Sequence, residues 1–465
     1  MKNANERFTA MQAAARQDPF PAWDQRAAHL KNLRTMLLKN REALATAISS
    51  DFGFRSKQEV ELSEIFLLKQ EIDDALKHGR RWMKPQRRSV GKWLQPARAR
   101  IVPQPLGVVG IMVPWNYPVL LSLGPLVGAL TAGNRAMIKM SELTPTTSAL
   151  MEQLLSDTFK QDHVTVVNGD ASIGAAFAAL PFNHLLFTGS TQVGRQVMRA
   201  AADNLTPVTL ELGGKSPAII GPHARFEYAV DSLLIGKLLN AGQTCVAPDY
   251  VLVPRAMETA FVERARISFA RMFPDMASNR DYTSIISPRH FARLQSLLAD
   301  AQAAGAQPHC LSTLPASSQT RRFPLVVVTN APEESALMQE EIFGPILPLV
   351  PYDTIDEAIA YINARPRPLS LYLYDDNRAT INQVLHETIS GGVAVNETLM
   401  HLACESLPFG GVGASGMGAY HGIGGFKTFS LMKPIFEQSR FNVRQWLSPP
   451  YGKRFEILMK IMLRL

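Results

Sequence analysis

The first part of the chain has apolar residues at helical spacing. One helical face is predicted from residues that recur three or four positions apart: Trp23, Ala27, Leu30, Leu33 and Leu37. Gly53, which follows a short polar run, indicates the end of this helical region. A second helix is expected over roughly residues 58–78. The chain therefore opens with helices before its first strand.

The middle of the chain alternates apolar strands with helices. The predicted strands lack the alternation of a half-exposed sheet: Val108 to Val113, Ala136 to Ile138, Val164 to Val167 and His184 to Phe187. Helices are expected between them, at Pro145 to Phe159 and Val193 to Ala202. Uninterrupted apolar strands separated by helices are typical of a parallel sheet buried on both faces. We therefore expect an open, doubly wound α/β sheet.

The same alternation starts again after about Gly213. The expected elements are the strand Ala218 to Ile220, the helix Phe226 to Asn240, the strand Tyr250 to Val253 and the helix Met257 to Phe273. A chain of 465 residues also exceeds what a single core usually supports. The sequence therefore predicts two doubly wound α/β domains.

Composition and charge narrow the classes of function. With 46% hydrophobic and 19% charged residues, the chain is expected to fold throughout. The formal net charge of +8 is concentrated between Arg80 and Arg100, but that segment offers few aromatic residues for base stacking and matches no nucleic-acid motif. We therefore expect a solvated or intersubunit face there, and no nucleic-acid partner.

Cysteine usage and apolar runs indicate the compartment. No secretory signal is expected in the first twenty residues, and no apolar run is long enough for an ordinary transmembrane helix. Three cysteines give no disulfide framework, and no clustered ligand set predicts a metal site. Cys310 and Cys404 are expected to be inert small hydrophobic residues. These features favour a reducing, cytoplasmic setting.

One cysteine and one glutamate have surroundings that suit catalysis. Cys245 lies on a turn that begins at Gly242, and Glu211 ends an apolar strand just before two glycines. A structural cysteine does not need such surroundings, whereas a nucleophile and its base do. We therefore expect Cys245 to be the nucleophile and Glu211 the base. No histidine has the spacing of a Cys–His dyad, so oriented amides, a nearby cofactor charge or Glu211 itself must favour the thiolate.

Three further segments follow strands, where open α/β sheets bind ligands. Asn116 offers an amide that could hold an oxyanion, and Lys139 with Glu142 offers a cation and a carboxylate for ribose hydroxyls. Gly189 and Ser190 lead from a strand into a helix, whose N-terminus attracts phosphate. Each segment taken alone also fits an ordinary turn. It is their combination with Cys245 that favours the functional interpretation.

A fourth glycine-rich run resembles a cofactor motif but lacks its context. Residues 411–416 fit the dinucleotide pattern G-x-G-x-x-G. The run follows Leu407-Pro408-Phe409-Gly410 instead of a strand, and it opens no predicted helix. We therefore expect the cofactor to bind elsewhere.

Together these segments closely resemble the NAD(P)-dependent aldehyde dehydrogenase superfamily. The residues that carry the resemblance occur in family order: Pro114 to Asn116, Lys139 to Glu142, Phe187 to Ser190, Glu211 to Gly214, Gly242 to Cys245, Glu341 to Pro345 and Pro408 to Gly411. Residues 138–145, 245–250 and 418–422 look like the class-three branch, most like its coniferyl-aldehyde dehydrogenases. The resemblance spans roughly residues 20–430.

The resemblance implies an activity and a chemical route. The expected reaction oxidises an aromatic aldehyde, such as coniferyl aldehyde, or a medium- to long-chain aliphatic aldehyde to the acid, through a thiohemiacetal and a thioester on Cys245. Asn116 and the Cys245 amide would hold the oxyanion, and Glu211 would activate the hydrolytic water. Two other hypotheses stay open at this point. A relative that passes the acyl group to coenzyme A would not need Glu211, and a catalytically retired structural or cofactor-binding protein would need none of these groups.

Further residues are assigned to the cofactor and the substrate by the resemblance. Glu341 and Phe343 would position the cofactor, and Tyr117 is a candidate for the substrate channel. NAD is the expected cofactor, with NADP as the alternative, because the Glu142 carboxylate would accept a ribose 2′-hydroxyl and repel a 2′-phosphate.

Domain boundaries and a homodimer also follow from the resemblance. It implies a Rossmann-like dinucleotide-binding domain at residues 1–86 and 106–211 and a catalytic domain at residues 212–425. The small β extension, residues 87–105 and 426–450, pairs as strands across the subunit interface in the resembling family. A two-fold homodimer is therefore expected.

The last segment, residues 451–465, predicts an amphipathic helix. Its apolar face comprises Phe455, Leu458, Met462 and Leu465, opposite several basic residues. Packing on the dimer is the favoured interpretation, although a basic amphipathic helix also suits peripheral contact with an anionic membrane. The segment is too short to span a bilayer.

Overall fold

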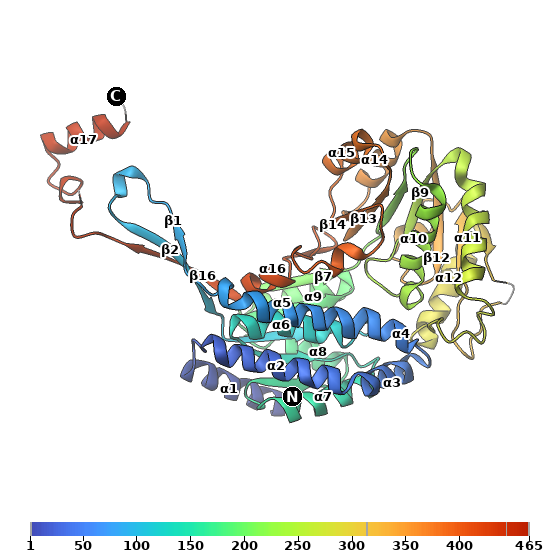
Figure 1. Cartoon of the computed structure of the whole chain (residues 1–465), viewed down its shortest axis with the longest axis horizontal. Helices are drawn as coiled ribbons and strands as arrows, with labels where there is room; N and C mark the ends of the chain where they lie inside the picture. Colours follow the sequence, from blue (N-terminus) through green and yellow to red (C-terminus); the bar gives the residue numbers. More distant parts are fainter. Residues whose placement is uncertain (1, 313–314, 443, 464–465) are drawn as a thin grey trace.

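A computed structural model describes residues 2–312, 315–442 and 444–463, and it contains two α/β units and a projecting arm (Figure 1). The first unit contains a six-stranded sheet in the order β15-β7-β6-β3-β4-β5, parallel except between β15 and β7. Its strands are β3 (Val108–Met112), β4 (Arg135–Lys139), β5 (Val164–Val167), β6 (His184–Gly189), β7 (Val208–Leu212) and β15 (Gly416–Met417). The strands predicted for this sheet are confirmed.

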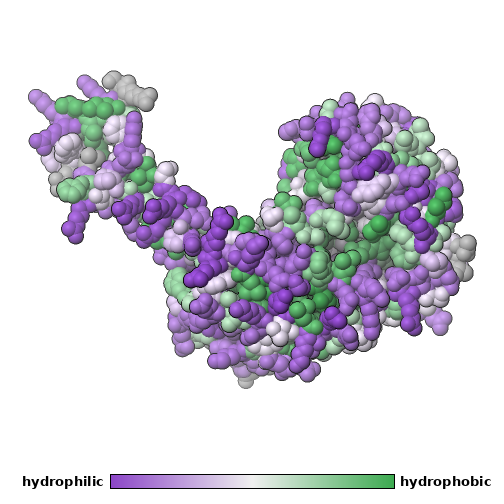
Figure 2. Space-filling model, in the orientation of Figure 1, coloured by the Kyte–Doolittle hydropathy of each residue, from purple (hydrophilic) through white to green (hydrophobic). Residues whose placement is uncertain are grey.

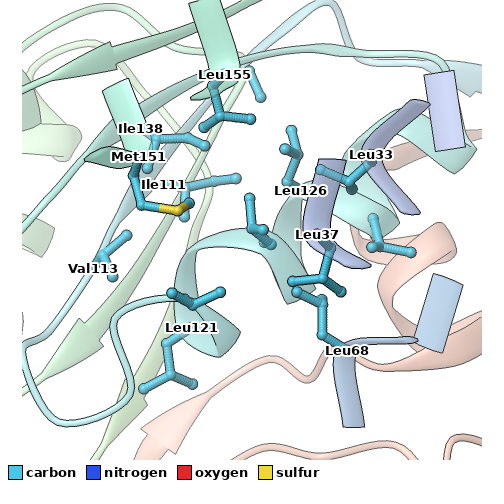
Figure 3. Close-up of a cluster of buried hydrophobic side chains, with 14 of the residues drawn as sticks. Leu33, Leu37, Leu68, Ile111, Val113, Leu121, Leu126, Ile138, Met151 and Leu155 are labelled. Atoms are coloured by element: carbon cyan, nitrogen blue, oxygen red, sulfur yellow. The ribbon is translucent and has the colours of Figure 1, made fainter. Parts of the chain in front are cut away.

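Helices cover both faces of the first sheet. Along β3, Val109 and Ile111 pack into one core, and Val108 and Met112 pack into another. Figure 3 shows Ile111 and Ile138 from the sheet facing leucines of the helices that cover the first of these cores. That layer comprises α2 (Trp23–Lys39), α3 (Arg41–Phe52), α5 (Leu67–Trp82), α6 (Leu120–Ala132) and α7 (Pro145–Thr158). The opposite layer comprises α1 (Lys2–Gln17), α8 (Ala171–Ala178) and α9 (Thr191–Ala202). The predicted doubly wound arrangement is therefore confirmed.

The N-terminal helices depart from the prediction in detail. Helix α1 precedes the first predicted helix, and the predicted helical region up to Gly53 is divided at Asn40 into α2 and α3. The helix expected over residues 58–78 consists of α4 (Lys57–Val60), the π-helix η1 (Glu61–Phe66) and α5. Helical spacing alone does not distinguish a π-turn, which inserts one residue into an otherwise continuous helix. Such turns often occur at functional sites.

The second unit contains a seven-stranded sheet in the order β10-β11-β12-β9-β8-β13-β14, antiparallel only between β10 and β11. Its strands are β8 (Pro217–Ile220), β9 (Tyr250–Pro254), β10 (Gln307–Cys310), β11 (Val326–Thr329), β12 (Ile346–Tyr352), β13 (Ser370–Tyr374) and β14 (Gly392–Val395). Its helices are α10 (Phe226–Leu238), η3 (Leu239–Gly242), η4 (Arg255–Met257), α11 (Glu258–Met272), α12 (Pro288–Ala303), α13 (Ala336–Gln339), α14 (Ile355–Asn363), α15 (Arg378–Glu387) and η5 (Met400–Ala403). Along β9, Val251 and Leu252 pack into cores on opposite faces, so this sheet is doubly wound as well.

The chain returns to the first unit earlier than expected. Strand β15 pairs with β7 of the first sheet, and Tyr420 and Phe426 lie in the first unit's core. Helix α16 (Gly422–Thr428) packs on α5 and α6. The predicted domain boundary at residue 425 therefore assigns β15 to the second unit, although β15 belongs to the sheet of the first. A two-residue strand carries no local signal of the strand with which it pairs.

The arm is a three-stranded antiparallel sheet formed within one chain. Strand β2 (Arg98–Pro105) lies between β1 (Gln86–Arg88) and β16 (Ser430–Glu437). Strands β2 and β16 pair with each other over their full lengths inside the chain. The expected pairing of this extension across a subunit interface stays a prediction, and β1 and β16 are the edge strands open to it. The Arg100 guanidinium also contacts the Glu437 carboxylate at 2.6 Å.

The predicted C-terminal helix lies at the tip of this arm. It is α17 (Lys453–Leu463), and η2 (Lys92–Leu94) and η6 (Arg444–Trp446) also belong to the region outside the two sheets. Ile457 and Ile461 of α17 are more than half exposed, and Figure 2 shows a hydrophobic patch at the tip of the arm. Leu465, part of the expected apolar face, lies outside the described residues. Among the described helices, none has both the length and the apolar character needed to cross a membrane.

Candidate active site

The turn before Cys245 has an unusual backbone. Asn240, Ala241 and Gly242 all have positive φ, at 54°, 52° and 77°. A Cβ atom on Gly242 would lie 2.6 Å from the Gly344 carbonyl oxygen, so only glycine fits this close approach. Consecutive left-handed residues store strain that typically marks a functional site. The turn thus holds Cys245 against the 341–345 loop.

Asn116 is brought to this turn by a set of amide hydrogen bonds. Its Nδ2 donates to the Gln243 carbonyl at 3.1 Å, and Asn240 Nδ2 donates to the Asn116 carbonyl at 3.0 Å. Gln243 Nε2 in turn donates to the Ser284 carbonyl at 3.1 Å. A side-chain amide has two N–H groups, so one remains for a ligand. The structure therefore places Asn116 beside the cysteine turn, as predicted.

A buried charged network beneath this turn was not predicted. Arg55 donates to the Asn116 carbonyl at 2.8 Å and to Glu64 Oε1 at 3.0 Å. Glu59 accepts from the Asn240 backbone N–H and from Thr283. Arg55 and Glu64 are buried completely, and burial raises the pKa of both glutamates, although the Arg55 charge opposes the rise. The sequence offered only an arginine and two glutamates, Arg55, Glu59 and Glu64, in a mostly polar segment at the start of the predicted helix.

Glu211 lies deep beside the cysteine. It is on β7 between β6 and β15, and its side chain is buried. Neither carboxylate oxygen has a hydrogen-bond partner among the described residues. Burial without a compensating partner raises the pKa of Glu211 well above its ordinary value. A carboxylate in this state readily accepts a proton.

The thiol of Cys245 is held in its neutral form. Burial is the largest cause that raises its pKa, to about 12, and the nearby Glu341 and Glu211 carboxylates raise it further. The backbone N–H groups of Cys245 and Val246 act in the opposite direction. Of the three influences considered from the sequence, oriented amides favour the thiolate, whereas the negative charge of Glu211 opposes it. The thiol must therefore lose its proton as it reacts.

A cavity of about 570 Å³ occupies the carboxyl ends of the first sheet's strands. It is lined by four of the predicted cofactor residues, Lys139, Glu142, Gly189 and Ser190. The Ser190 side chain caps α9 by accepting from the Val193 N–H, and the helix N-terminus favours phosphate. Residues 411–416 do not line this cavity. His290 and Arg293, which the sequence analysis missed, do line it.

The cation and the carboxylate expected at the ribose are adjacent in this cavity. Lys139 Nζ donates to the carbonyls of Met140 and Gly169, at 2.7 and 2.8 Å, and lies 3.9 Å from Glu142 Oε2. The Glu142 side chain is half exposed toward the cavity mouth. These polar groups and the free helix terminus fit a dinucleotide with a ribose and a pyrophosphate.

The 341–345 loop contacts the site from the other side. Arg293 donates to the carbonyls of Glu341 and Ile342, at 2.7 and 2.9 Å, which fixes the loop. A Cβ atom on Gly213 would lie 1.9 Å from Glu341 Oε2, so this carboxylate packs directly on the glycine. Burial, followed by the Asp249 charge, raises the pKa of Glu341 to about 8.

Phe343 does not line the cofactor cavity directly. Its backbone φ is 54°, and its ring lies edge-on against Trp115 at 5.3 Å between centroids. Trp115 is in the cavity wall, so Phe343 supports that wall.

A second, smaller cavity of about 180 Å³ opens at Cys245. Its wall is almost entirely apolar, and the polar residues in it include Tyr117 and Thr244, whose hydroxyls are 2.7 Å apart. Because Trp115 lines the first cavity and Tyr117 the second, Asn116 lies between them. The larger apolar lining residues are Leu62, Phe66, Leu67, Leu120, Leu121, Leu239, Leu399, Met400, Leu402 and Phe409.

The other two thiols lie outside both cavities. Cys310 and Cys404 are free and exposed, and the expectation that they are inert small hydrophobic residues stays a prediction. Cys310 is at the end of the edge strand β10, and Cys404 follows η5.

Comparisons with known proteins identify the family of this chain. The aldehyde dehydrogenase family model matches residues 2–435. A probable coniferyl aldehyde dehydrogenase of Pseudomonas aeruginosa is 52% identical over 97% of this chain and 94% of its own length. Aldehyde dehydrogenase family 3 member A2 of Mus musculus is 40% identical over 88% of this chain and 83% of its own length.

Solved structures lead to the same family. A substrate-bound structure of Staphylococcus aureus AldH is similar with a TM-score of 0.93, at 36% identity over 99% of each chain. Betaine aldehyde dehydrogenase from S. aureus, a mutant in complex with NAD⁺, is similar with a TM-score of 0.85, at 25% identity over 96% of this chain and 92% of that one. The chain therefore belongs to the aldehyde dehydrogenase family and is an NAD(P)-dependent enzyme that oxidises an aldehyde to the acid.

Proposed function

We propose that the physiological substrate is an aromatic aldehyde of the coniferyl type or a medium- to long-chain aliphatic aldehyde. The observation that carries this proposal is the apolar cavity with Cys245 in its wall. Leu62, Phe66 and Met400, which line it, are about half exposed, so the apolar surface extends from the cavity to the solvent. Relatives that bear the name coniferyl aldehyde dehydrogenase support the aromatic choice.

The proposed reaction starts with the Cys245 thiol. As the thiol gives its proton to water, sulfur attacks the aldehyde carbonyl, the C=O π bond breaks, and a thiohemiacetal oxyanion forms. The Asn116 amide and the Cys245 backbone N–H would hold the oxyanion, and each would lower the activation barrier by about 3 kcal/mol. The residues that line the first cavity would hold NAD(P)⁺, which would supply the hydride acceptor, and loss of hydride from this carbon would leave a thioester on Cys245.

Glu211 would act in the second half of the reaction. Its unpartnered carboxylate has a raised pKa, so it can take a proton from the water that attacks the thioester. Glu341, the second carboxylate close to Cys245, is held by its contact with Gly213 and would position the cofactor. The presence of a water-activating base favours hydrolysis over transfer to coenzyme A.

The substrate proposal is tested with a panel of aldehydes. Cinnamyl, benzyl and hexyl aldehydes should exceed acetaldehyde in kcat/KM by at least about tenfold, because each buried methylene contributes about 0.8 kcal/mol. Steady-state NADH formation at saturating cofactor measures these values. Equal kcat/KM for acetaldehyde and the larger aldehydes would contradict an apolar substrate site.

NAD is expected to be preferred over NADP. The Glu142 carboxylate lies in the cofactor cavity, where it would repel a 2′-phosphate, and the nearby Lys139 reduces this effect. The ratio of kcat/KM with NAD to kcat/KM with NADP should therefore be above one, and Glu142→Gln should lower this ratio toward one. Asp157→Asn is the matched control, since Asp157 is exposed on α7 outside the cavity. A wild-type preference for NADP would refute the assignment of Glu142.

The chain is also proposed to form a cytoplasmic homodimer. A free-standing arm with a partly exposed apolar tip leaves surface that a second copy can cover. Three free cysteines suit a reducing compartment. Light scattering at micromolar concentration should give twice the chain mass of 51.3 kDa. A mass equal to one chain would contradict the proposal. If the dimer binds anionic vesicles through α17, the tip of the arm faces a membrane and not the second copy.

A further inference from the structure

Arg55 is a buried cation whose side chain contacts the segment that carries Asn116. It lies in the loop between α3 and α4, and it lines neither the 570 Å³ cavity nor the 180 Å³ cavity. A buried guanidinium is costly unless hydrogen-bond partners and opposite charges surround it. The partners that surround Arg55 therefore show which parts of the site this cation holds in place.

The Asn116 amide is fixed through both its main chain and its side chain. The Asn116 carbonyl accepts two hydrogen bonds, from Arg55 Nη1 at 2.8 Å and from Asn240 Nδ2 at 3.0 Å. The side chain donates one of its two N–H groups to the Gln243 carbonyl at 3.1 Å. Because the amide is planar, these contacts also set the direction of the second N–H. That second N–H is the proposed oxyanion donor.

Glu64 orients Arg55 and holds the residues that follow Asn116. Its Oε1 accepts from Arg55 Nη1 at 3.0 Å, and its Oε2 accepts from the backbone N–H groups of Val119 and Leu120 at 2.8 and 3.1 Å. These two N–H groups are at the start of α6, where helix N–H groups have no partner within the helix. The Arg55–Glu64 pair therefore holds the segment 116–120 at both ends.

Arg55 is also linked to the cysteine turn. Its guanidinium carbon lies 4.6 Å from the centroid of the Tyr117 ring, and the Tyr117 hydroxyl is 2.7 Å from Thr244 Oγ1. Arg55 Nε lies 3.8 Å from Glu59 Oε1, which accepts from the backbone N–H of Asn240. One side chain thus contacts groups that hold the oxyanion donor, the wall of the substrate cavity and the turn before the nucleophile.

We propose that Arg55 is a positioning residue of the oxyanion hole, which sets the place of the Asn116 amide relative to Cys245. The inference rests on the proposed role of Asn116 as an oxyanion donor. Such a donor is effective only when it stands about 3 Å from the place where the oxyanion forms, before the charge develops. Arg55 touches neither cavity, so it acts on the reaction through Asn116.

The arrangement requires a guanidinium and not simply a positive charge. The planar fork of Arg55 presents N–H groups in fixed directions, so it reaches the Asn116 carbonyl, Glu64 and, at 3.4 Å, Ser63 Oγ. Lysine keeps the charge that compensates the buried Glu59 and Glu64, but all its donors are on one atom. Arg55→Lys therefore changes the geometry, whereas loss of the charge would leave two buried carboxylates without a cation.

Arg55→Lys tests the proposal in a double-mutant cycle with Asn116→Ala. The value of kcat/KM should fall by about 10–30-fold in Arg55→Lys and by about 10²–10³-fold in Asn116→Ala. In the Asn116→Ala background, Arg55→Lys should lower kcat/KM by less than about twofold, because the donor that Arg55 positions is already absent. Single-turnover NADH formation and steady-state turnover should both slow in Arg55→Lys, since an oxyanion forms in each half of the reaction.

Cofactor binding and a second buried arginine provide the controls. The dissociation constant for NAD⁺ should stay within about twofold of wild type in Arg55→Lys, because Arg55 does not line the cofactor cavity. Arg26 is also buried and also donates to backbone carbonyls, but it lines neither cavity and contacts no residue of the site. Arg26→Lys should therefore keep the wild-type kcat/KM.

Two outcomes would overturn the positioning role. One is a kcat/KM within twofold of wild type in Arg55→Lys. The other is a double variant in which the two losses multiply, because Arg55 would then act independently of Asn116. Thermal melting checks that the variants are folded. If Arg55→Lys is unfolded, Glu64→Gln takes its place in the cycle, since a glutamine has one acceptor oxygen and cannot hold both Arg55 and the start of α6.

The single variants distinguish the two levels of the inference. If Asn116→Ala keeps nearly normal turnover, the proposed oxyanion donor is wrong, and the positioning role of Arg55 is wrong with it. If Asn116→Ala is slow while Arg55→Lys is normal, the oxyanion donor stands and only the positioning role is wrong.

Discussion

Replacing Cys245 with alanine is expected to reduce aldehyde oxidation by at least about 10⁴-fold, because no covalent intermediate can form without the nucleophile. Cofactor binding should persist. The residues that line the 570 Å³ cavity do not include Cys245, so the dissociation constant for NAD⁺ should stay within about twofold of wild type. Steady-state NADH formation measures the first effect, and a fluorescence titration with NAD⁺ measures the second.

The two exposed cysteines provide matched controls for this experiment. Cys310→Ala and Cys404→Ala remove thiols of the same chemistry that do not line either cavity, so both variants should keep wild-type activity. Near-normal turnover of the Cys245 variant would exclude the proposed mechanism. Loss of NAD⁺ binding together with activity would instead indicate that Cys245 holds the turn in place.

Local patterns were sufficient for the sheets and for part of the site. The apolar strands Val108–Met112 and Val164–Val167 are buried on both faces, and such strands need no alternation to be recognised. Cys245 and Glu211 stand near turns whose glycines approach other groups closely, as Gly242 and Gly213 do, and Asn116 follows the end of β3. These signals are short in sequence, which explains why they could be interpreted without the structure.

Contacts between distant segments could not be predicted in this way. The Arg55 network joins residues of four separate segments, and each of its charges resembles an ordinary surface charge until burial is known. Strand β15 has two residues and takes its position only from β7. The pairing of β2 with β16 within the chain depends on where both segments leave the first unit, and nothing local in either segment indicates it.

Changing Glu211 to glutamine should separate the two halves of the reaction. Glutamine cannot accept the proton of the attacking water, so thioester hydrolysis should slow by about 10²–10⁴-fold. Hydride transfer precedes this step and should proceed. Stopped-flow measurement of NADH is therefore expected to give a burst close to the enzyme concentration, followed by a slow steady state.

The pH dependence gives a second, independent sign of the same role. Burial raises the Glu211 pKa, and only the deprotonated carboxylate can take a proton from water. In the wild type, kcat should therefore rise with pH as Glu211 ionises, and this rise should be lost in Glu211→Gln. The rate of the burst in the variant should still depend on pH, because the Cys245 thiol must lose its proton in both proteins.

Glu341 is the matched comparison, since it is the other carboxylate whose charge acts on the Cys245 thiol. Glu341→Gln should slow hydride transfer and give no burst, because the proposed role of this residue is to position the cofactor. If Glu211→Gln gives no burst because hydride transfer itself is lost, the role of Glu211 is to activate the thiol. A burst in Glu341→Gln but not in Glu211→Gln would exchange the two roles, since the charges of both carboxylates act on the thiol.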